Sequence, residues 1–144
     1  MEAALAASCG TVCAIERNAD AIELMRKNRE AFGLTNLVVV EGEAPDALDG
    51  LPAPDRVFIG GSAGNLDAIV GAALGANPHV RICITAITLE TLSAALECLS
   101  CRGVEDADIV QVSVARADKV GSYHLMRAEN PIYIITAAFD GGDA

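Results

Sequence analysis

Tryptophan is absent from this 144-residue chain, and aromatic residues make up only 3% of it. Positive charge is also scarce, because 10 Lys and Arg stand against 20 Asp and Glu, which gives a net charge of −10. A protein that binds a nucleic-acid backbone needs clustered basic side chains, and one that stacks on bases needs aromatic ones. The composition therefore argues against a nucleic-acid partner.

Long hydrophobic runs are missing as well. No apolar stretch approaches the ~20 residues that span a bilayer, so we expect no membrane partner. No basic segment followed by an apolar one begins the chain, so we expect no secretory signal. The cysteine count is odd, at five, which together with the missing signal favours reduced thiols and a cytoplasmic location.

One pair of cysteines, Cys98 and Cys101, has the CxxC spacing. A zinc site needs two further ligands, and no second CxxC or HxxxH follows. A thioredoxin-like redox pair would open a helix, whereas this pair closes a predicted one. We interpret both thiols as small buried side chains and predict no metal site.

Hydrophobic residues make up 52% of the chain, enough for a packed core, and the length fits a single domain over residues 1–144. Short apolar runs alternate with segments of helical periodicity. The predicted strands are Thr11–Ile15, Leu37–Val40, Asp55–Ile59 and His79–Ile87. The predicted helices run from Asn18 or Asp20 to Phe32, from Asn65 to Leu74 and from Thr88 to Cys101. Alternation of this kind predicts an α/β fold around a mostly parallel sheet.

Two details complete the expected fold. The helix that ends at Phe32 shows an apolar stripe of Ala21, Leu24, Met25, Asn28 and Phe32, which we expect to face the core. The last forty residues carry three strand patterns without helices, at Asp108–Ala115, Val120–Met126 and Pro131–Thr136. These strands should finish the sheet in antiparallel fashion at one edge.

Polar or glycine-rich segments follow three of the predicted parallel strands, and ligands bind at the carboxyl ends of such strands. Glu16 follows the first, and a carboxylate there can accept both hydroxyls of a ribose. Glu43 and Ala44 follow the second and could meet an adenine. The run Gly60–Asn65 follows the third, where glycine lets a ligand approach the backbone closely. Taken singly, each segment is equally compatible with a solvated loop or turn.

Together these segments resemble the class I S-adenosylmethionine-dependent methyltransferases, which have a Rossmann-like sheet. More specifically, the chain resembles the precorrin-6B carbon-15 methyltransferase (decarboxylating) family of cobalamin biosynthesis. The segments that carry the resemblance are VCAIERNADAIELMRKN (12–28), NLVVVEGEAPDAL (36–48), LPAPDRVFIGGSAGNL (51–66), ITLETLSAAL (87–96), VQVSVARA (110–117) and MRAENPIYII (126–135). The resemblance covers nearly the whole chain, and PAPDRVFIGGSAGNL is its most specific part.

The resemblance implies S-adenosylmethionine as cofactor and a precorrin, a polycarboxylated tetrapyrrole, as substrate. The implied reaction methylates carbon 15 and removes carbon dioxide from the ring C acetate. We nominate no catalytic residue, because the conjugated macrocycle can activate the carbon nucleophile without a protein base. The implied cofactor-binding residues are Glu16, Arg17, Glu43, Ala44, Gly60 and Gly61, and the implied substrate-binding residues are Ser62, Asn65, Arg116, Lys119 and Arg127.

Some of these residues admit a second interpretation. Asn65 serves equally well as the N-cap of the helix that follows. Arg116, Lys119, His124 and Arg127 either attract the carboxylates of a substrate or form a solvated strand face. The resemblance also implies a homo-oligomer, with a tetramer as one form, and we expect the antiparallel C-terminal strands at its interface.

The sequence departs from the family at its beginning. The family starts with a strand and a D-x-G-x-G-x-G-type loop, whereas Met1–Leu5 aligns with the helix after that loop. We therefore expect a sheet truncated at its N-terminal side, which lacks the central strand between Thr11–Ile15 and Asp55–Ile59. Three interpretations stay open: a non-catalytic fragment of the enzyme, a relative that has become an oligomer subunit, and an adenosine-binding regulatory module that uses Glu16 and Glu43.

Overall fold

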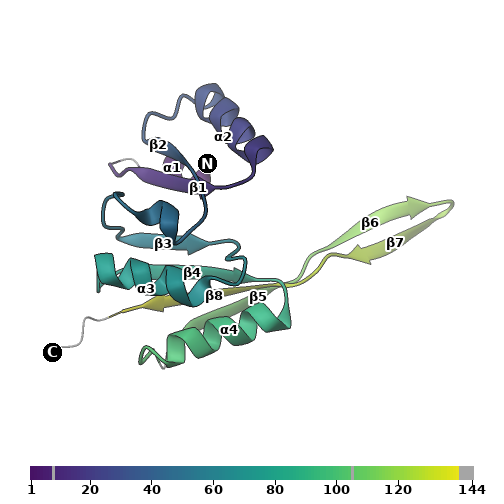
Figure 1. Ribbon diagram of the computed structural model, residues 1–144. Helices are drawn as coiled ribbons and strands as arrows, with labels where there is room; N and C mark the ends of the chain where they lie inside the picture. Colours follow the sequence, from purple (N-terminus) through teal and green to yellow (C-terminus); the bar gives the residue numbers. More distant parts are fainter. Residues whose placement is uncertain (8, 105, 140–144) are drawn as a thin grey trace. The chain divides into compact units, whose positions relative to one another are not determined.

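The computed structural model describes residues 1–7, 9–104 and 106–139. These residues divide into two compact units, the first ending at Pro52 and the second beginning at Ala53. Figure 1 labels their helices and strands. The expectation of one methyltransferase domain stays a prediction. In the part of the chain described, no helix is long and apolar enough to cross a membrane.

The first unit holds a two-stranded parallel sheet. Its elements are α1 (Glu2–Ala6), β1 (Val12–Glu16), α2 (Ala19–Ala31), β2 (Leu37–Glu41) and the short 3₁₀ helix η1 (Asp46–Leu48). The register pairs Val12 with Leu37 and Glu16 with Glu41, so both strands end at the same edge. The Asn36 side chain donates to the carbonyl oxygens of Ala4 (2.9 Å) and Ala7 (2.8 Å), which fastens α1 to the start of β2.

Helix α2 begins and ends where local chemistry predicts. The Asn18 side chain accepts a hydrogen bond from the Ala21 N–H at 3.1 Å, as an N-cap does. Gly33 has a φ of 62° and donates to the Glu30 carbonyl, while Leu34 donates to Arg29, so the helix ends in a glycine turn.

The predicted buried stripe of α2 is wrong in part. Leu24 and Phe32 are 58% and 60% exposed, and the buried residue of the helix is Ile22. Ala21, Met25 and Asn28 are half-buried. The buried face of α2 is therefore rotated relative to the predicted stripe. The prediction missed this because the stripe left out Ile22, the residue next to Ala21.

The second unit holds a four-stranded sheet in the order β3-β4-β8-β5. Its elements are β3 (Arg56–Ile59), α3 (Leu66–Ala76), β4 (Arg81–Ala86), α4 (Leu89–Ser100), β5 (Asp108–Val112), β6 (Ala115–Val120), β7 (Tyr123–Ala128) and β8 (Ile132–Ala138). Strands β3 and β4 are parallel, and β8 runs antiparallel to both β4 and β5. The predicted antiparallel finish of the sheet is therefore confirmed.

The core of the second unit lies between this sheet and its two helices. Its largest fully buried side chains are Ile82, Ile84, Leu99, Ile135, Val70 and Val80. They come from β4, α4, β8, α3 and the residue before β4, in line with the alternating strand and helix pattern.

The sequence prediction was wrong about the strands between β5 and β8. Val120–Met126 is not one strand, because Gly121 has a φ of 61° and turns the chain, so that β6 and β7 pair antiparallel on either side. We call β6, β7 and their turn the hairpin. The hairpin forms a separate two-stranded sheet and extends away from the four-stranded sheet of the same unit (Figure 1).

The described strands form three separate sheets, and the expected loss of a central strand stays a prediction. Among the described strands, β1 pairs with β2 alone and β3 with β4 alone. One edge of each of these strands therefore has no backbone partner in the part of the chain described.

Candidate functional site

The residues predicted to bind the cofactor lie at the carboxyl ends of strands, as the sequence predicts. Glu16 is the last residue of β1, and Arg17 follows it. Glu43 and Ala44 lie in the turn between β2 and η1. Gly60 and Gly61 directly follow β3 in the second unit. The structure brings each set together within its own unit.

Glu16 is held by the backbone of the turn that follows it. Its Oε1 accepts hydrogen bonds from the N–H groups of Arg17 (2.9 Å) and Asn18 (2.8 Å). No described residue donates to Oε2. Two bonds to one oxygen fix the carboxylate and leave the other oxygen able to accept hydroxyl groups of a ligand.

Arg17 connects Glu16 and Glu43, the two acidic residues predicted to bind the cofactor. Its backbone N–H bonds Glu16, and its Nη1 donates to Oε2 of Glu43 at 2.9 Å. Both side chains are largely exposed, with 63% of Arg17 and 44% of Glu43 accessible. A second ion pair at the same strand ends joins Arg26 and Glu41 at 3.8 Å.

The turn that carries Glu43 needs a glycine. Gly42 has a φ of 151°, and a Cβ on it would lie 2.8 Å from the Cβ of Ala47. Gly42 also donates its N–H to the Glu16 carbonyl at 3.0 Å. This close approach sets Glu43 beside the end of β1, where Arg17 reaches it.

The segment Gly60–Asn65 of the second unit, which we call the glycine loop, has a defined shape. Ala63 and Gly64 have φ values of 48° and 90°, and the Asn65 N–H donates to the Ser62 carbonyl at 2.7 Å, which closes a tight turn. At its start, the Thr85 hydroxyl donates to the Ile59 carbonyl at 3.4 Å. The loop is therefore anchored at both ends.

Gly60 and Gly61 differ in whether the surrounding protein leaves room for a side chain. A Cβ on Gly60 would lie 3.3 Å from the ring of Phe58, whereas a Cβ on Gly61 would meet nothing within 4 Å. Packing within the protein thus gives no reason for glycine at position 61. Ser62 is half-buried, and Asn65 occupies the N-cap position of α3 without a capping hydrogen bond from its side chain.

The predicted basic residues Arg116, Lys119 and Arg127 lie on the hairpin and are exposed. The register pairs Arg116 with Arg127 and Lys119 with His124. Paired residues share a face of a two-stranded sheet, and faces alternate along each strand. The two arginines therefore lie on one face of the hairpin, and Lys119 lies on the other.

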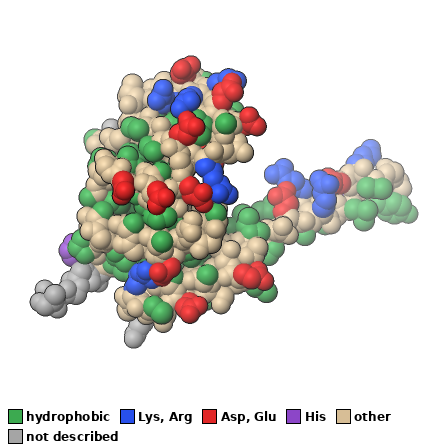
Figure 2. Space-filling model, viewed as in Figure 1, with side chains coloured by type: hydrophobic (Ala, Val, Ile, Leu, Met, Phe, Trp, Pro, Cys, Tyr) green, Lys and Arg blue, Asp and Glu red, His purple; other side chains and the backbone are tan. Residues whose placement is uncertain are grey.

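Sequence reasoning missed the acidic partners of these arginines. Arg116 Nε lies 2.9 Å from Oε1 of Glu129, and Arg127 Nε lies 3.2 Å from Oδ2 of Asp118. Figure 2 shows basic and acidic side chains side by side along the hairpin. Their proximity depends on the pairing register, and a correct placement of the turn at Gly121 would have indicated it.

A cluster of Arg102, Asp67 and Cys98 in the second unit connects two helices. Arg102 Nη1 donates to Oδ1 of Asp67 (2.6 Å) and to the carbonyl oxygen of Cys98 (2.9 Å), so it ties the start of α3 to the end of α4. The hydrogen bond from Arg102 lowers the pKa of Asp67, and burial raises the pKa of the Cys98 thiol.

The two cysteines of the CxxC pair differ in exposure. Cys98 is buried, as predicted, whereas Cys101 is exposed, which corrects the prediction that both are buried. Within the described residues no disulfide joins the cysteines, and no group of three potential ligands could hold a metal ion.

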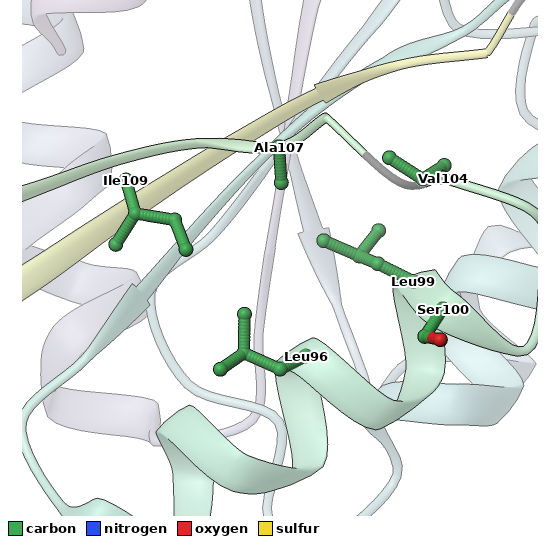
Figure 3. A pocket seen from close by; sticks show the side chains of 6 residues that line it. All are labelled: Leu96, Leu99, Ser100, Val104, Ala107 and Ile109. Atoms are coloured by element: carbon green, nitrogen blue, oxygen red, sulfur yellow. The ribbon is translucent and has the colours of Figure 1, made fainter.

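A shallow apolar groove lies between α4 and β5 (Figure 3). Its lining residues are Leu96, Leu99, Ser100, Val104, Ala107 and Ile109. None of the predicted site residues lines it, and the lining residues that the structure describes carry no charge, so it is a poor match for a nucleoside or a polycarboxylate.

Comparison with known proteins gives consistent matches. The family model described as a precorrin methyltransferase domain matches residues 1–138. The cobalt-precorrin-6B C(15)-methyltransferase (decarboxylating) of Salmonella typhimurium is 37% identical over 136 residues, which cover 94% of this chain and 70% of that protein. The chain spans between 66% and 71% of the length of the curated relatives it matches.

Solved structures agree with the predicted fold. The precorrin-6Y C5,15-methyltransferase of Geobacter metallireducens has a TM-score of 0.79 and 39% identity, over 91% of this chain and 69% of that one. An S-adenosylmethionine-dependent O-methyltransferase of Thermotoga maritima has a TM-score of 0.61 at 15% identity, over 88% of this chain and 49% of that one. The predicted Rossmann-like class I methyltransferase fold, mostly parallel with antiparallel C-terminal strands, is confirmed.

Proposed function

The chain belongs to the precorrin methyltransferase domain family, and on that premise we propose that it methylates carbon 15 of precorrin-6B or cobalt-precorrin-6B with decarboxylation. The reaction belongs to cobalamin biosynthesis. The observation that carries the proposal is the fixed carboxylate of Glu16, joined through Arg17 to Glu43 at the ends of two parallel strands.

The residues of the first unit fit the adenosine part of S-adenosylmethionine. Oε2 of Glu16 would accept the ribose hydroxyls, since Oε1 is already bonded to the backbone. Arg17, Glu43 and Ala44 would surround the adenine. The cofactor, when bound, supplies an activated methyl group on its sulfonium sulfur.

The residues of the second unit fit the donor and the acceptor. Gly60 and Gly61 would let a ligand approach the backbone, in keeping with the open space at Gly61. Ser62 and Asn65 would contact the substrate at the mouth of the binding site. Arg116, Lys119 and Arg127 would pair with substrate carboxylates in a chain that is otherwise acidic.

We assign no general base to this reaction. The conjugated macrocycle makes carbon 15 nucleophilic, and loss of carbon dioxide from the ring C acetate accompanies the transfer. The protein would then act by holding the two reactants in line, which is itself a large source of rate. Fixed groups such as Glu16 suit that task, because a carboxylate already bonded to the backbone needs no reordering.

The test is a turnover assay with the purified chain, methyl-labelled S-adenosylmethionine and the tetrapyrrole substrate. We expect a labelled product by mass spectrometry and release of carbon dioxide. Binding of adenosine without either product would overturn the proposal and support the adenosine-binding module. A chain that binds neither ligand would support the non-catalytic fragment or oligomer subunit.

We also propose that the protein is cytoplasmic and forms a homo-oligomer, with a tetramer as the expected form. The odd number of cysteines, five, supports a reducing compartment. Large exposed apolar side chains on the C-terminal strands support association, among them Val120, Tyr123, Leu125 and Met126 at 53–75% exposure.

Sedimentation of the intact chain tests the oligomer. We expect a mass above that of one chain, and we expect Met126→Glu on the hairpin to lower it. The matched control is Leu24→Glu on α2 of the first unit, where the leucine is 58% exposed against 67% for Met126. A monomeric wild type, or equal effects of the two variants, would contradict this interface.

A further inference from the structure

The hairpin and the glycine loop both begin at the same edge of the four-stranded sheet. Strands β5 and β4 run in the same direction, because each is antiparallel to β8. Strand β3 is parallel to β4. The carboxyl ends of β3 and β5 thus share one edge, so the loop that starts at Gly60 and the hairpin that follows β5 both start there.

One face of the hairpin collects its paired charges. This face, which we call the arginine face, carries Arg116, Asp118, Arg127 and Glu129, with Val120, Tyr123 and Leu125 toward the turn. The opposite face carries Ala115, Ala117, Lys119, His124, Met126 and Ala128. The hairpin thus separates two arginines from the nearby lysine.

Arg116 and Arg127 lie directly opposite each other, and repulsion between like charges disfavours this arrangement. Each is neutralised by one acid, Arg116 by Glu129 at 2.9 Å and Arg127 by Asp118 at 3.2 Å. Both guanidinium side chains are 73% exposed. Ion pairs this exposed contribute little to stability and exchange partners easily.

We propose that the arginine face binds carboxylate groups of the tetrapyrrole, and that Asp118 and Glu129 occupy the two guanidinium groups until the substrate carboxylates replace them. This inference rests on the proposed function, since it takes its substrate class from there. Arginine presents a planar fork that matches a carboxylate, and two such forks side by side match a ligand with several carboxylates.

The charges of the surroundings favour this occupant. Residues 115–129 contain three Lys and Arg against two Asp and Glu, whereas the whole chain carries a net charge of −10. An anionic ligand near the acidic remainder of the chain is repelled, so the hairpin is the segment of this sheet edge best suited to hold it. Asp118 and Glu129 then act as competitors of the substrate.

This competition gives a signature that a structural role lacks. Breaking the ion pairs from the acidic side (Asp118→Asn with Glu129→Gln) leaves two arginines without their acids and should tighten binding. Breaking the same pairs from the basic side (Arg116→Gln with Arg127→Gln) removes the binding groups and should weaken it. If the pairs only stabilised the hairpin, both double variants would act in the same direction.

The experiment measures binding of uroporphyrin, a tetrapyrrole with acetate and propionate groups on every ring, to the full chain by fluorescence quenching. We expect the acidic double variant to bind several-fold tighter and the arginine double variant about tenfold more weakly. Lys119→Gln, which removes one charge from the opposite face, should have a smaller effect than either Arg116→Gln or Arg127→Gln alone. Circular dichroism confirms that each variant is folded.

Further arms separate the possible outcomes. A cationic porphyrin of similar size should not bind, and the salt dependence of uroporphyrin binding should fall in the arginine double variant. Equal weakening by both double variants, or no change in either, overturns the inference. If the binding results follow the expected order while methyl transfer is absent, the proposed function fails and the inference about the arginine face stands. If methyl transfer occurs and the arginine double variant leaves the KM for the tetrapyrrole unchanged, the proposed function stands and the inference fails.

Discussion

Arg17 donates from Nη1 to Oε2 of Glu43 at 2.9 Å and so joins the end of β1 to the turn after β2. The same residue donates its backbone N–H to Glu16. Two acidic residues that are 27 positions apart in the sequence are thereby linked through one arginine at the edge where parallel strands end. The carboxylates of Glu16 and Glu43 are thus held by hydrogen bonds before any ligand arrives, as the nucleoside contact proposed above requires.

Glu16→Gln tests the ribose contact. Glutamine keeps an oxygen for the backbone N–H groups of Arg17 and Asn18 but replaces Oε2 with a donor. We expect adenosine affinity to fall about ten- to hundredfold, the value of hydrogen bonds to a charged group. Calorimetric titration measures it, with 2′,3′-dideoxyadenosine, which lacks the 2′ and 3′ hydroxyls of the ribose, as the comparison ligand. A loss of equal size for both ligands would contradict the assigned contact.

Gly61→Ala tests whether the glycine loop is shaped for a ligand. An added Cβ meets nothing within 4 Å, so thermal stability should stay the same or rise slightly, by about 0.4–1 kcal/mol, because the unfolded chain loses freedom. The rate of methyl transfer should fall, because the alanine side chain occupies space that the ligand needs. The matched control is Gly33→Ala, where the φ of 62° predicts a loss of about 1 kcal/mol. Full activity of Gly61→Ala would argue against the loop as a binding element.

Ala63→Gly tests the strain in the same turn. Ala63 has a φ of 48°, which costs a residue with a Cβ roughly 1–2 kcal/mol. We therefore expect glycine at this position to raise the melting temperature. Ala68→Gly, at an exposed position inside α3, should lower stability by about 0.5–1 kcal/mol. Equal losses in the two variants would show that the turn is not strained.

The Asp67–Arg102 pair predicts an acid-sensitive connection between α3 and α4. The hydrogen bond from Arg102 lowers the pKa of Asp67 in the folded state. A lowered pKa stabilises the fold above the ordinary pKa of the carboxyl, and this contribution is lost as the pH falls through the folded pKa. Denaturation below roughly pH 4 should therefore be steeper for the wild type than for Asp67→Asn.

The control for this prediction is Asp55→Asn, because Asp55 is exposed and forms no ion pair within the described residues. Its acid denaturation should follow that of the wild type. If Asp67→Asn and Asp55→Asn behave alike, the ion pair with Arg102 does not contribute to stability at any pH.

The sequence predicted the locally determined parts of the structure. The helix starts at Asn18, one of the two residues predicted, and at Thr88 depend on residues a few positions apart, and both are confirmed. The strand ends that carry Glu16, Glu43 and Gly60 followed from apolar runs and turns alone.

Features that depend on pairing across strands were not predicted. The turn at Gly121 was placed inside a strand, because the alternating pattern continues through it. Without that turn there was no register, so nothing indicated that Arg116 and Arg127 share a face, that Lys119 lies opposite, or that Asp118 and Glu129 pair with the arginines. The contact of Arg17 with Glu43 likewise depends on the parallel pairing of β1 with β2.

The most direct test of the account is calorimetric titration of the purified chain with S-adenosylmethionine, with Glu43→Ala beside it. The control is Arg26→Gln, which breaks the ion pair with Glu41 at the same strand ends without touching Arg17 or Glu43. We predict saturable binding by the wild type and by Arg26→Gln, and binding at least tenfold weaker by Glu43→Ala. A folded wild type that binds no cofactor, or a Glu43→Ala variant that binds it equally well, would contradict the account.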